Sequence, residues 1–219
     1  MLKPIKVASL ASEAFDRVVD AITSGEFEPG EKISESRLAR ELGISRGPIR
    51  EALQRLEGRL VVRTPRLGVR VIKFGREELL QLFYVREAVE GMAARLAATN
   101  ATTRWIQHAE AMLHEHEKNI SGSRNQAYRF KSLDQDFHLS VARAAKCEKI
   151  ERLLLSEVYY QLRILRLKSS TQPGRARSAL SEHFAILERI KARDPDGAES
   201  AMREHIRLAR DSSLRAISD

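Results

Sequence analysis

The segment from Ser34 to Glu57 constrains the fold more than any other part of this chain, because two short amphipathic helices meet there at a glycine. Leu38 and Leu42 fall on one face of the first helix, and Gly43 supplies the turn that follows it. In the second helix, apolar residues recur at positions i, i+3, i+4 and i+7, the stripe by which a helix packs on a core. These residues are Ile49, Ala52, Leu53 and Leu56. The pattern predicts a helix-turn-helix.

The outward face at the start of the second helix carries the candidates for contact with DNA. Ser45 is placed to cap this helix, and Pro48 falls in its first turn, where a missing N–H costs nothing. The second helix of a helix-turn-helix enters the major groove with its N-terminal residues against the base edges. The candidate contact residues are Ser45, Arg46, Gly47 and Arg50. Because arginine can bond two acceptors of guanine at once, we expect Arg46 or Arg50 to read a base.

Segments on both sides of this motif complete a domain. Before it, apolar residues at helical spacing predict a helix that runs from about Phe15 to Ser24. After it, residues 60–73 contain two β-branched runs separated by a turn with Pro and Gly, which predicts a hairpin. A helix-turn-helix followed by a hairpin is a winged helix. Arg66 and Gly68 would lie at the tip of the wing, where an arginine can enter a minor groove and a small residue lets the backbone approach.

Positive charge is concentrated in the same segment. Residues 37–73 contain ten lysines and arginines against three glutamates, a net +7 of the +8 carried by the whole chain. Such a basic field is typical of a domain that binds DNA phosphates. A basic face that only meets solvent is the alternative, and it leaves the coincident motif unexplained. Aromatic residues make up only 5% of the chain, so duplex DNA is a better partner than stacked single strands.

The length of 219 residues allows two modest domains, which we place at residues 1–74 and 75–219. The single cysteine, Cys147, excludes an internal disulfide. No apolar run reaches the roughly 18 residues that a membrane span needs, and the first ten residues lack a signal-peptide core. We therefore expect a soluble, cytoplasmic protein.

Residues 75–219 lack strand-like runs and are rich in Ala, Leu, Glu and Arg, which predicts an all-helical domain. The predicted helices span about 77–99, 102–119, 125–146, 148–170, 174–192 and 195–215. Three histidines on the polar second helix are expected to face solvent: His108, His114 and His116. The chain as a whole is expected to be mainly α, a winged helix-turn-helix followed by a helical bundle.

The other three histidines fall in a pattern that could hold a metal. Asp134 and His138 are four apart on one predicted helix, so their side chains point the same way. His183 and His205 lie on two later helices, each with apolar neighbours at helical spacing. Three imidazoles and a carboxylate suit a divalent transition metal such as zinc, nickel or manganese. An Asp/His pair at this spacing is more often a surface hydrogen bond, so spacing alone does not decide between the two.

The sequence from Ser24 to Glu57 resembles the winged-helix domain of GntR-family transcription regulators. The landmarks that it shares with that family are Gly25, Pro29, Gly30, Leu38, Gly43, Ser45, Arg46, Arg50, Ala52 and Leu53. The helical half, which opens with LLQLFYVREAVEGMAARLAA, resembles the FadR-type effector domain of the family, the FCD domain. Together the two resemblances cover nearly the whole chain. They imply a DNA-binding regulator, typically a repressor, that binds a palindromic operator as a homodimer.

The resemblance also implies a metal site. Many effector domains of this type join an Asp-x-x-x-His pair on one helix to two later histidines about 22 residues apart. Asp134, His138, His183 and His205 match this pattern, the last two with a spacing of 22. The resemblance further implies that the metal helps to hold a small carboxylate effector, such as a hydroxy, keto or sugar acid, whose binding alters the affinity for DNA.

Three positions need comment beside the family pattern. Relatives usually carry arginine at the position of Ser36, so the neighbouring Arg37 becomes the candidate for that contact with DNA. Gly47 stands where threonine is common, which removes a hydroxyl. Arg86 lies where some relatives place an arginine that faces the cavity, and a guanidinium suits an effector carboxylate. A surface ion pair of Arg86 with Glu87 or Glu90 is the alternative.

Two other classes of protein are alternatives to a ligand-responsive regulator. A metal-dependent hydrolase could use three histidines and an aspartate to activate water. No nucleophile elbow, phosphate-binding loop or obvious general base accompanies the motif, and the basic winged helix would be unexplained, so we expect no enzyme. A constitutive dimeric DNA-binding protein is the other rival, and it would need no metal and no effector.

Overall fold

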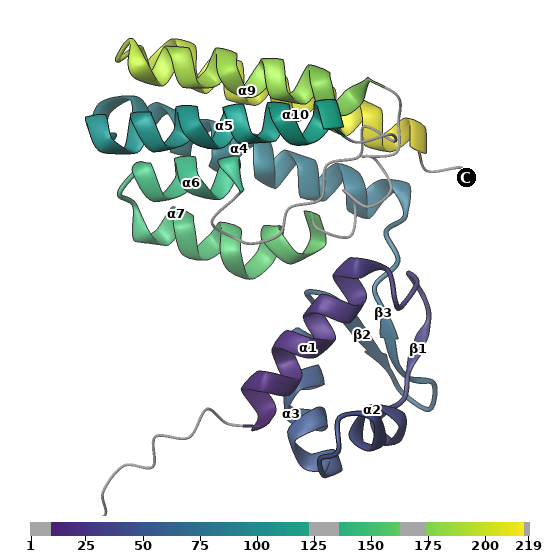
Figure 1. Cartoon of the computed structure of the whole chain (residues 1–219). Coiled ribbons are helices and arrows are strands. Elements are labelled where there is room, and N and C mark those ends of the chain that lie inside the picture. The colour runs from purple at the N-terminus through teal and green to yellow at the C-terminus, as the bar shows by residue number, and fades with distance from the viewer. Residues whose placement is uncertain (1–9, 123–135, 163–173, 217–219) are drawn as a thin grey trace, which may run out of the picture. The chain divides into compact units, whose positions relative to one another are not determined.

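The computed structural model describes residues 10–122, 136–162 and 174–216. By its internal contacts the chain divides into two compact units, Met1–Phe74 and Gly75–Asp219 (Figure 1). Each unit is described by itself.

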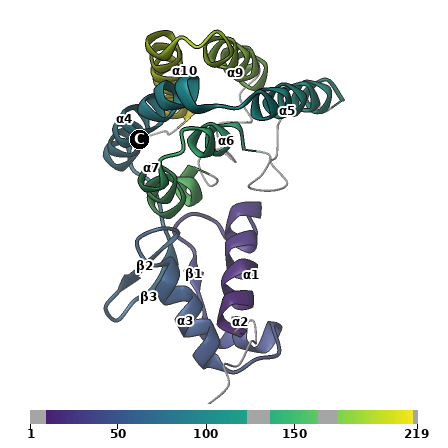
Figure 2. The same ribbon diagram turned by 90° about the vertical axis from the view of Figure 1, so that its left-hand side faces the viewer.

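The N-terminal unit combines three helices with a small sheet (Figure 2). Its helices are α1 (Leu10–Ser24), α2 (Glu35–Glu41) and α3 (Arg46–Leu56). Its strands are β1 (Lys32–Ile33), β2 (Val61–Thr64) and β3 (Gly68–Val71). The sheet is antiparallel in the order β1-β3-β2, with Val62 opposite Arg70 in the hairpin. This is a winged helix-turn-helix, as predicted, with β1 as a strand that the sequence did not indicate.

The helix-turn-helix forms for the reasons that the sequence suggested, with one difference at a cap. Gly43 has a φ of +66° in the turn, a conformation that glycine adopts without strain. Ser34 caps α2, its side chain accepting the backbone N–H of Arg37 at 3.3 Å. Ser45 occupies the N-cap position of α3, but its side chain makes no capping hydrogen bond, so that prediction was wrong in detail.

The core of the winged helix lies between α1 and α3. The apolar residues predicted to point inward from α3 are all fully buried: Ile49, Ala52, Leu53 and Leu56. On α1, Val18 and Ile22 are each 1% exposed and pack on the same side. Because its inner face is held this firmly, the outer face of α3 is presented on a rigid support.

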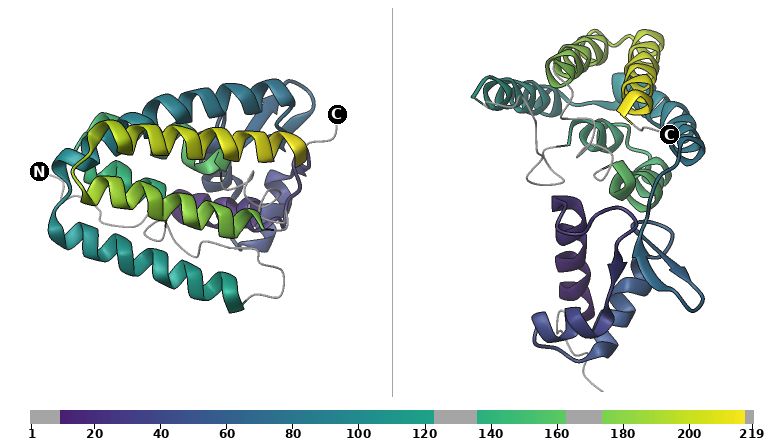
Figure 3. Two further views of the ribbon diagram at one scale, coloured as in Figure 1. Left: turned by 90° about the horizontal axis from the view of Figure 1, so that it is seen from above. Right: turned by 90° about the vertical axis from the view of Figure 1, so that its right-hand side faces the viewer.

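The C-terminal unit is built of helices alone within the described residues. Its longer helices are α4 (Arg76–Asn100), α5 (Thr103–Gly122), α9 (Arg175–Lys191) and α10 (Pro195–Ala216). Shorter elements are α6 (Phe137–Ala144), α7 (Glu148–Leu153) and the π-helix η2 (Leu154–Val158). Helix α10 packs against α4 and α9, α5 against α9, and α6 against α4 (Figure 3). None of the described helices is long and apolar enough to span a membrane.

Three predictions for this unit need correction or remain outside the structure. The helix expected over 125–146 is described only from Phe137, where the side chain of Asp136 caps it by accepting the backbone N–H groups of His138 and Leu139. The helix expected over 148–170 is interrupted by the π-helix and is described to residue 162. His116 is 4% exposed on the inner face of α5, so the expectation that it faces solvent was wrong, whereas His108 and His114 are exposed.

Candidate metal centre and nucleic-acid interface

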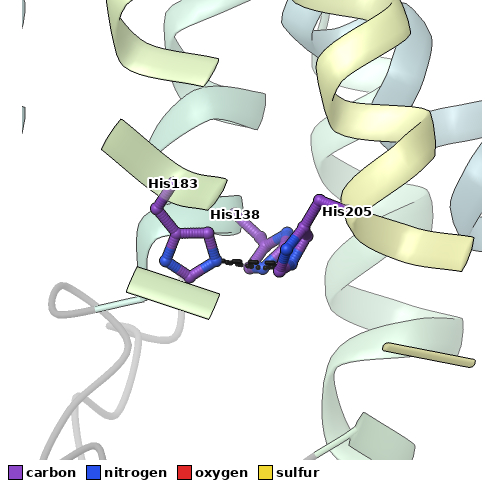
Figure 4. A group of neighbouring side chains, drawn as sticks. All are labelled: His138, His183 and His205. Atoms are coloured by element: carbon purple, nitrogen blue, oxygen red, sulfur yellow. Dashed lines mark hydrogen bonds between the residues drawn. The ribbon is translucent and has the colours of Figure 1, made fainter. Parts of the chain in front are cut away.

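Three histidines from three helices meet inside the C-terminal unit. His138 on α6, His183 on α9 and His205 on α10 point their Nε2 atoms toward one another (Figure 4). The Nε2 atoms of His138 and His183 are 3.2 Å apart, those of His183 and His205 3.3 Å, and those of His138 and His205 3.2 Å. Each residue is at most 7% exposed. The structure thus brings together the three histidines that the sequence singled out.

Two carboxylates fix the orientation of two of these rings. Glu90 on α4 accepts a hydrogen bond from Nδ1 of His138 at 2.5 Å, and Glu182 on α9 accepts one from Nδ1 of His205 at 2.5 Å. A neutral imidazole that donates through Nδ1 carries a lone pair on Nε2. The lone pairs of His138 and His205 therefore face each other across 3.2 Å, where neither can donate to the other. Nε2 of His183, 3.2 Å from one and 3.3 Å from the other, can donate a proton to only one of them, whereas a shared cation satisfies both.

Arginines stand behind both carboxylates. Arg86 Nε donates to Glu90 at 2.7 Å, and both are almost fully buried. Arg175 donates through two nitrogens to the two oxygens of Glu182, at 2.8 and 3.0 Å. Burial works to raise the pKa of Glu90, but Arg86 and His138 hold that pKa far below its usual range. The pKa of Glu182 is lowered in the same way, against burial, by hydrogen bonds from His205 and Arg175. Both carboxylates are therefore ionised acceptors.

The electrostatics favour a neutral, metal-binding imidazole at His205. Burial lowers the pKa of His205 to about 4, although Glu182 acts in the opposite direction. At neutral pH its Nε2 is therefore an available lone pair. For metal–nitrogen bonds of about 2.0–2.1 Å and angles between tetrahedral and octahedral values, neighbouring nitrogens lie about 2.9–3.4 Å apart. The observed spacings fall in this range, so the three rings fit one ion bound on one side, with its other positions open.

The remaining candidates of this site are placed differently. Asp134 lies outside the described residues. Arg86 forms the ion pair with Glu90 that was one of its two alternatives, but it is buried and not on the surface. A pocket opens beside His138, and the described residues that line it are Glu90, Asp136, His138, Leu139, Leu154, Val158, Tyr159 and Leu162.

The candidates for DNA contact lie on the outer surface of the winged helix. All those in α3 and its cap are exposed: Ser45, Arg46, Gly47 and Arg50. Arg37 is also exposed and pairs with Glu41 at 2.7 Å. At the tip of the hairpin, Arg66 has a φ of +67° and Gly68 a φ of +86°. An arginine held in the left-handed region is strained, and such strain often marks a functional position.

Family models match both units of this chain. A model described as "Bacterial regulatory proteins, gntR family" matches residues 10–71, and the FCD domain model matches residues 81–208. The chain belongs to the GntR family. It is a DNA-binding transcription regulator with an FCD domain, and the metal-dependent hydrolase that the sequence left as a rival is set aside, because the families and relatives are regulators and not enzymes.

Relatives of this GntR-family regulator include proteins named as repressors. It is 30% identical over 207 residues to a probable D-xylose utilization operon transcriptional repressor of Paenarthrobacter nicotinovorans. The matched region covers 93% of this chain and 88% of that protein. It is 29% identical to the repressor RspR of Escherichia coli K12, over 81% of this chain and 77% of that one. Among solved structures, E. coli McbR/YncC has the same fold, with a TM-score of 0.77 at 19% identity over 95% of this chain and 99% of the other.

Sequence reasoning missed the two carboxylates that hold the histidines. Glu90 follows Arg86 by one helical turn, a spacing that signals an ion pair but not a link to His138, which is 48 residues away. Glu182 immediately precedes His183 but bonds to His205 on the next helix. Only the packing of α4 against α6 and of α9 against α10 brings these groups together.

Proposed function

We propose that this GntR-family regulator is a metal-dependent sensor whose affinity for a palindromic operator is modulated by a small carboxylate. The observation that carries the proposal is the pair of Nε2 lone pairs on His138 and His205, fixed by Glu90 and Glu182, which face each other across 3.2 Å. Nothing in a bundle that only dimerises requires such an arrangement. Nε2 of His183 lies within hydrogen-bond distance of both and can donate a proton to only one of them at a time. A buried lone pair left over in this way is costly, and a cation shared by the three rings removes that cost.

The metal would be held by His138, His183 and His205, with Asp134 as a proposed fourth ligand. Zinc, nickel and manganese all suit this donor set. When bound, the ion supplies a positive charge with open positions for a carboxylate. The lining of the adjacent pocket supports this role, because its described charged residues other than histidine, Glu90 and Asp136, are both carboxylates. An anionic effector would therefore rely on the ion, and Arg86 could contribute only by sharing its guanidinium with Glu90.

The winged helix would bind the operator. We propose that α3 enters the major groove with Arg46 or Arg50 at a base, while Arg37 and Arg66 contact the backbone or minor groove and Gly68 lets the wing approach. Binding would take place in the cytoplasm, on two half-sites that match the two protomers. Repression relieved by the effector is the expected mode.

We propose that the homodimer forms through α4. This helix exposes Tyr84, Val85 and Met92, which are 57%, 42% and 40% exposed. Several large apolar side chains exposed on one helix are the kind of surface that a partner can cover. Replacement of Met92 by Glu should shift the protein toward monomer in sedimentation equilibrium. The same change at Leu153 on α7, which is 39% exposed, is the matched control and should leave the dimer intact.

Metal content tests the sensor directly. Purified, tag-free protein should contain about one transition metal per chain by mass spectrometry, and His183→Ala should lose it. His108→Ala removes an exposed histidine of α5 and should keep the metal. If wild-type protein incubated with zinc, nickel or manganese holds no metal, the sensor is withdrawn and a constitutive dimeric DNA-binding protein takes its place.

A further inference from the structure

Three arginines on the outer surface of the winged helix converge on one carboxylate. Glu35, the first residue of α2, lies 3.3 Å from Arg50 Nε, 3.9 Å from Arg46 Nη2 and, through its other oxygen, 3.6 Å from Arg63 Nη1. Arg46 and Arg50 belong to α3, whereas Arg63 belongs to β2 of the wing. One side chain thus joins three consecutive elements, α2, α3 and β2.

The exposures of these side chains are unequal. The side chain of Glu35 is 15% exposed, whereas those of Arg46 and Arg50 are 62% and 61% exposed. The arginines therefore hold the carboxylate on their inner side and keep most of their surface open to a ligand. Arg63 is 38% exposed and is also paired with Glu57 at 3.6 Å.

A carboxylate at this place works against the binding of phosphates, because it cancels one positive charge in a surface that attracts a polyanion. Its presence is explained by what it does to the arginines. Arg46 and Arg50 are one helical turn apart, where like charges repel each other, and an arginine side chain has many rotamers. A carboxylate between them offsets the repulsion and restricts the directions of both guanidiniums before DNA arrives.

We propose that Glu35 is a positioning residue for sequence discrimination: it touches no base itself, but it aims Arg46 and Arg50 and ties the wing to α3 through Arg63. The proposal rests on the proposed function of α3 as the recognition helix. It goes beyond that function because it assigns operator specificity to an acidic residue of α2.

The test compares specific and non-specific DNA. Wild-type protein selects a duplex from a random pool, and a shuffled duplex of the same composition serves as the non-specific probe. Dissociation constants for both duplexes are then measured at several salt concentrations for wild type and for Glu35→Gln. Glu51→Gln, at an exposed position of α3, is the matched control because it makes the same change of charge.

We expect Glu35→Gln to lower the ratio of specific to non-specific affinity by about tenfold or more, since one well-aimed arginine–guanine pair discriminates by roughly 5- to 150-fold. Affinity for the shuffled duplex should stay the same or rise. Glu51→Gln should preserve the ratio. In an Arg50→Ala background, Glu35→Gln should have a much smaller effect, because the group that it aims is gone.

Two results separate this proposal from the one on which it rests. If Arg50→Ala and Arg46→Ala both bind the selected duplex as wild type does, α3 is not the recognition helix and both proposals fail. If these variants lose binding but Glu35→Gln changes both affinities by the same factor, only the role of Glu35 is overturned. Should Glu35→Gln fail to fold by circular dichroism, Glu35→Asp keeps the charge but draws it back by one methylene. That variant should still lower the ratio, and a preserved ratio would refute the positioning role.

Discussion

Replacement of Glu182 by Gln should weaken metal binding without unfolding the protein. The carboxylate accepts Nδ1–H of His205 at 2.5 Å and fixes the ring with Nε2 turned inward. Glutamine keeps the shape of the side chain but loses its negative charge. That charge strengthens the hydrogen bond from Nδ1 and makes Nε2 of His205 a better ligand for the ion. Loss of such a supporting group typically weakens metal affinity by about 10- to 100-fold, or about 1.4–2.8 kcal/mol. Because the side chains of Arg175 and Glu182 are 16% and 19% exposed, Arg175 keeps access to solvent when its partner loses its charge, and the loss of stability should be small.

The affinity is measured by competition for zinc with a chromophoric chelator at neutral pH. Glu188→Gln is the control, since Glu188 lies on the same helix, is 66% exposed and pairs only loosely with Lys191 at 3.7 Å. It should bind zinc as wild type does. An unchanged zinc affinity in Glu182→Gln, with the chain folded, would show that this carboxylate does not support the site. The evidence that the Nε2 lone pair of His205 binds a metal would then be lost, and only that for His138 would remain.

Three further predictions concern stability, each measured on metal-free protein. Glu90→Gln should destabilise by about 3–5 kcal/mol in urea unfolding, because it removes the negative charge that Glu90 holds 2.7 Å from the buried Arg86. Glu90→Gln with Arg86→Met should recover most of the loss, and equal stability of the single variant and wild type would contradict this. Leu53→Ala removes a fully buried side chain of α3 and should lower the free energy of unfolding by about 2–5 kcal/mol in thermal unfolding. Val62, on the wing, is 45% exposed, and Val62→Ala should change that free energy by no more than about 0.5 kcal/mol. Stability should fall as the pH drops from about 6.5 to about 4, because the unfolded chain takes up a proton that buried His205, with its pKa of about 4, does not bind; the fall should be shallower in His205→Gln.

The winged helix could be predicted from the sequence because its elements carry their own signals. The stripe from Ile49 to Leu56 and the glycine at position 43 fix the helix-turn-helix by local spacing, and the structure buries or turns them as expected. Strand β1 could not be predicted in this way, since two residues show no periodicity and Lys32 and Ile33 become a strand only by pairing with β3. The exposed side of α3 followed directly from knowing its buried side.

The helical half was predictable in its helices and less so in their faces. His138, His183 and His205 were chosen from a spacing that the family resemblance made specific, and the structure brings their Nε2 atoms together. The many charged residues around His116 predict a solvent-exposed face, and this prediction was wrong. In fact α5 packs on α9, and His116 lies on a buried face.

The same construction occurs in both halves of this regulator. In the C-terminal unit, Glu90 and Glu182 hold the imidazoles that would meet the ion; in the N-terminal unit, Glu35 holds the arginines that would meet DNA. Each carboxylate bonds to a residue on another element, so it joins two elements while it aims a functional side chain. Side chains that touch a ligand have chemistry that a sequence displays. The groups that aim them are ordinary glutamates whose roles exist only after folding, and substitutions at those glutamates should change specificity or affinity while leaving every contact residue in place.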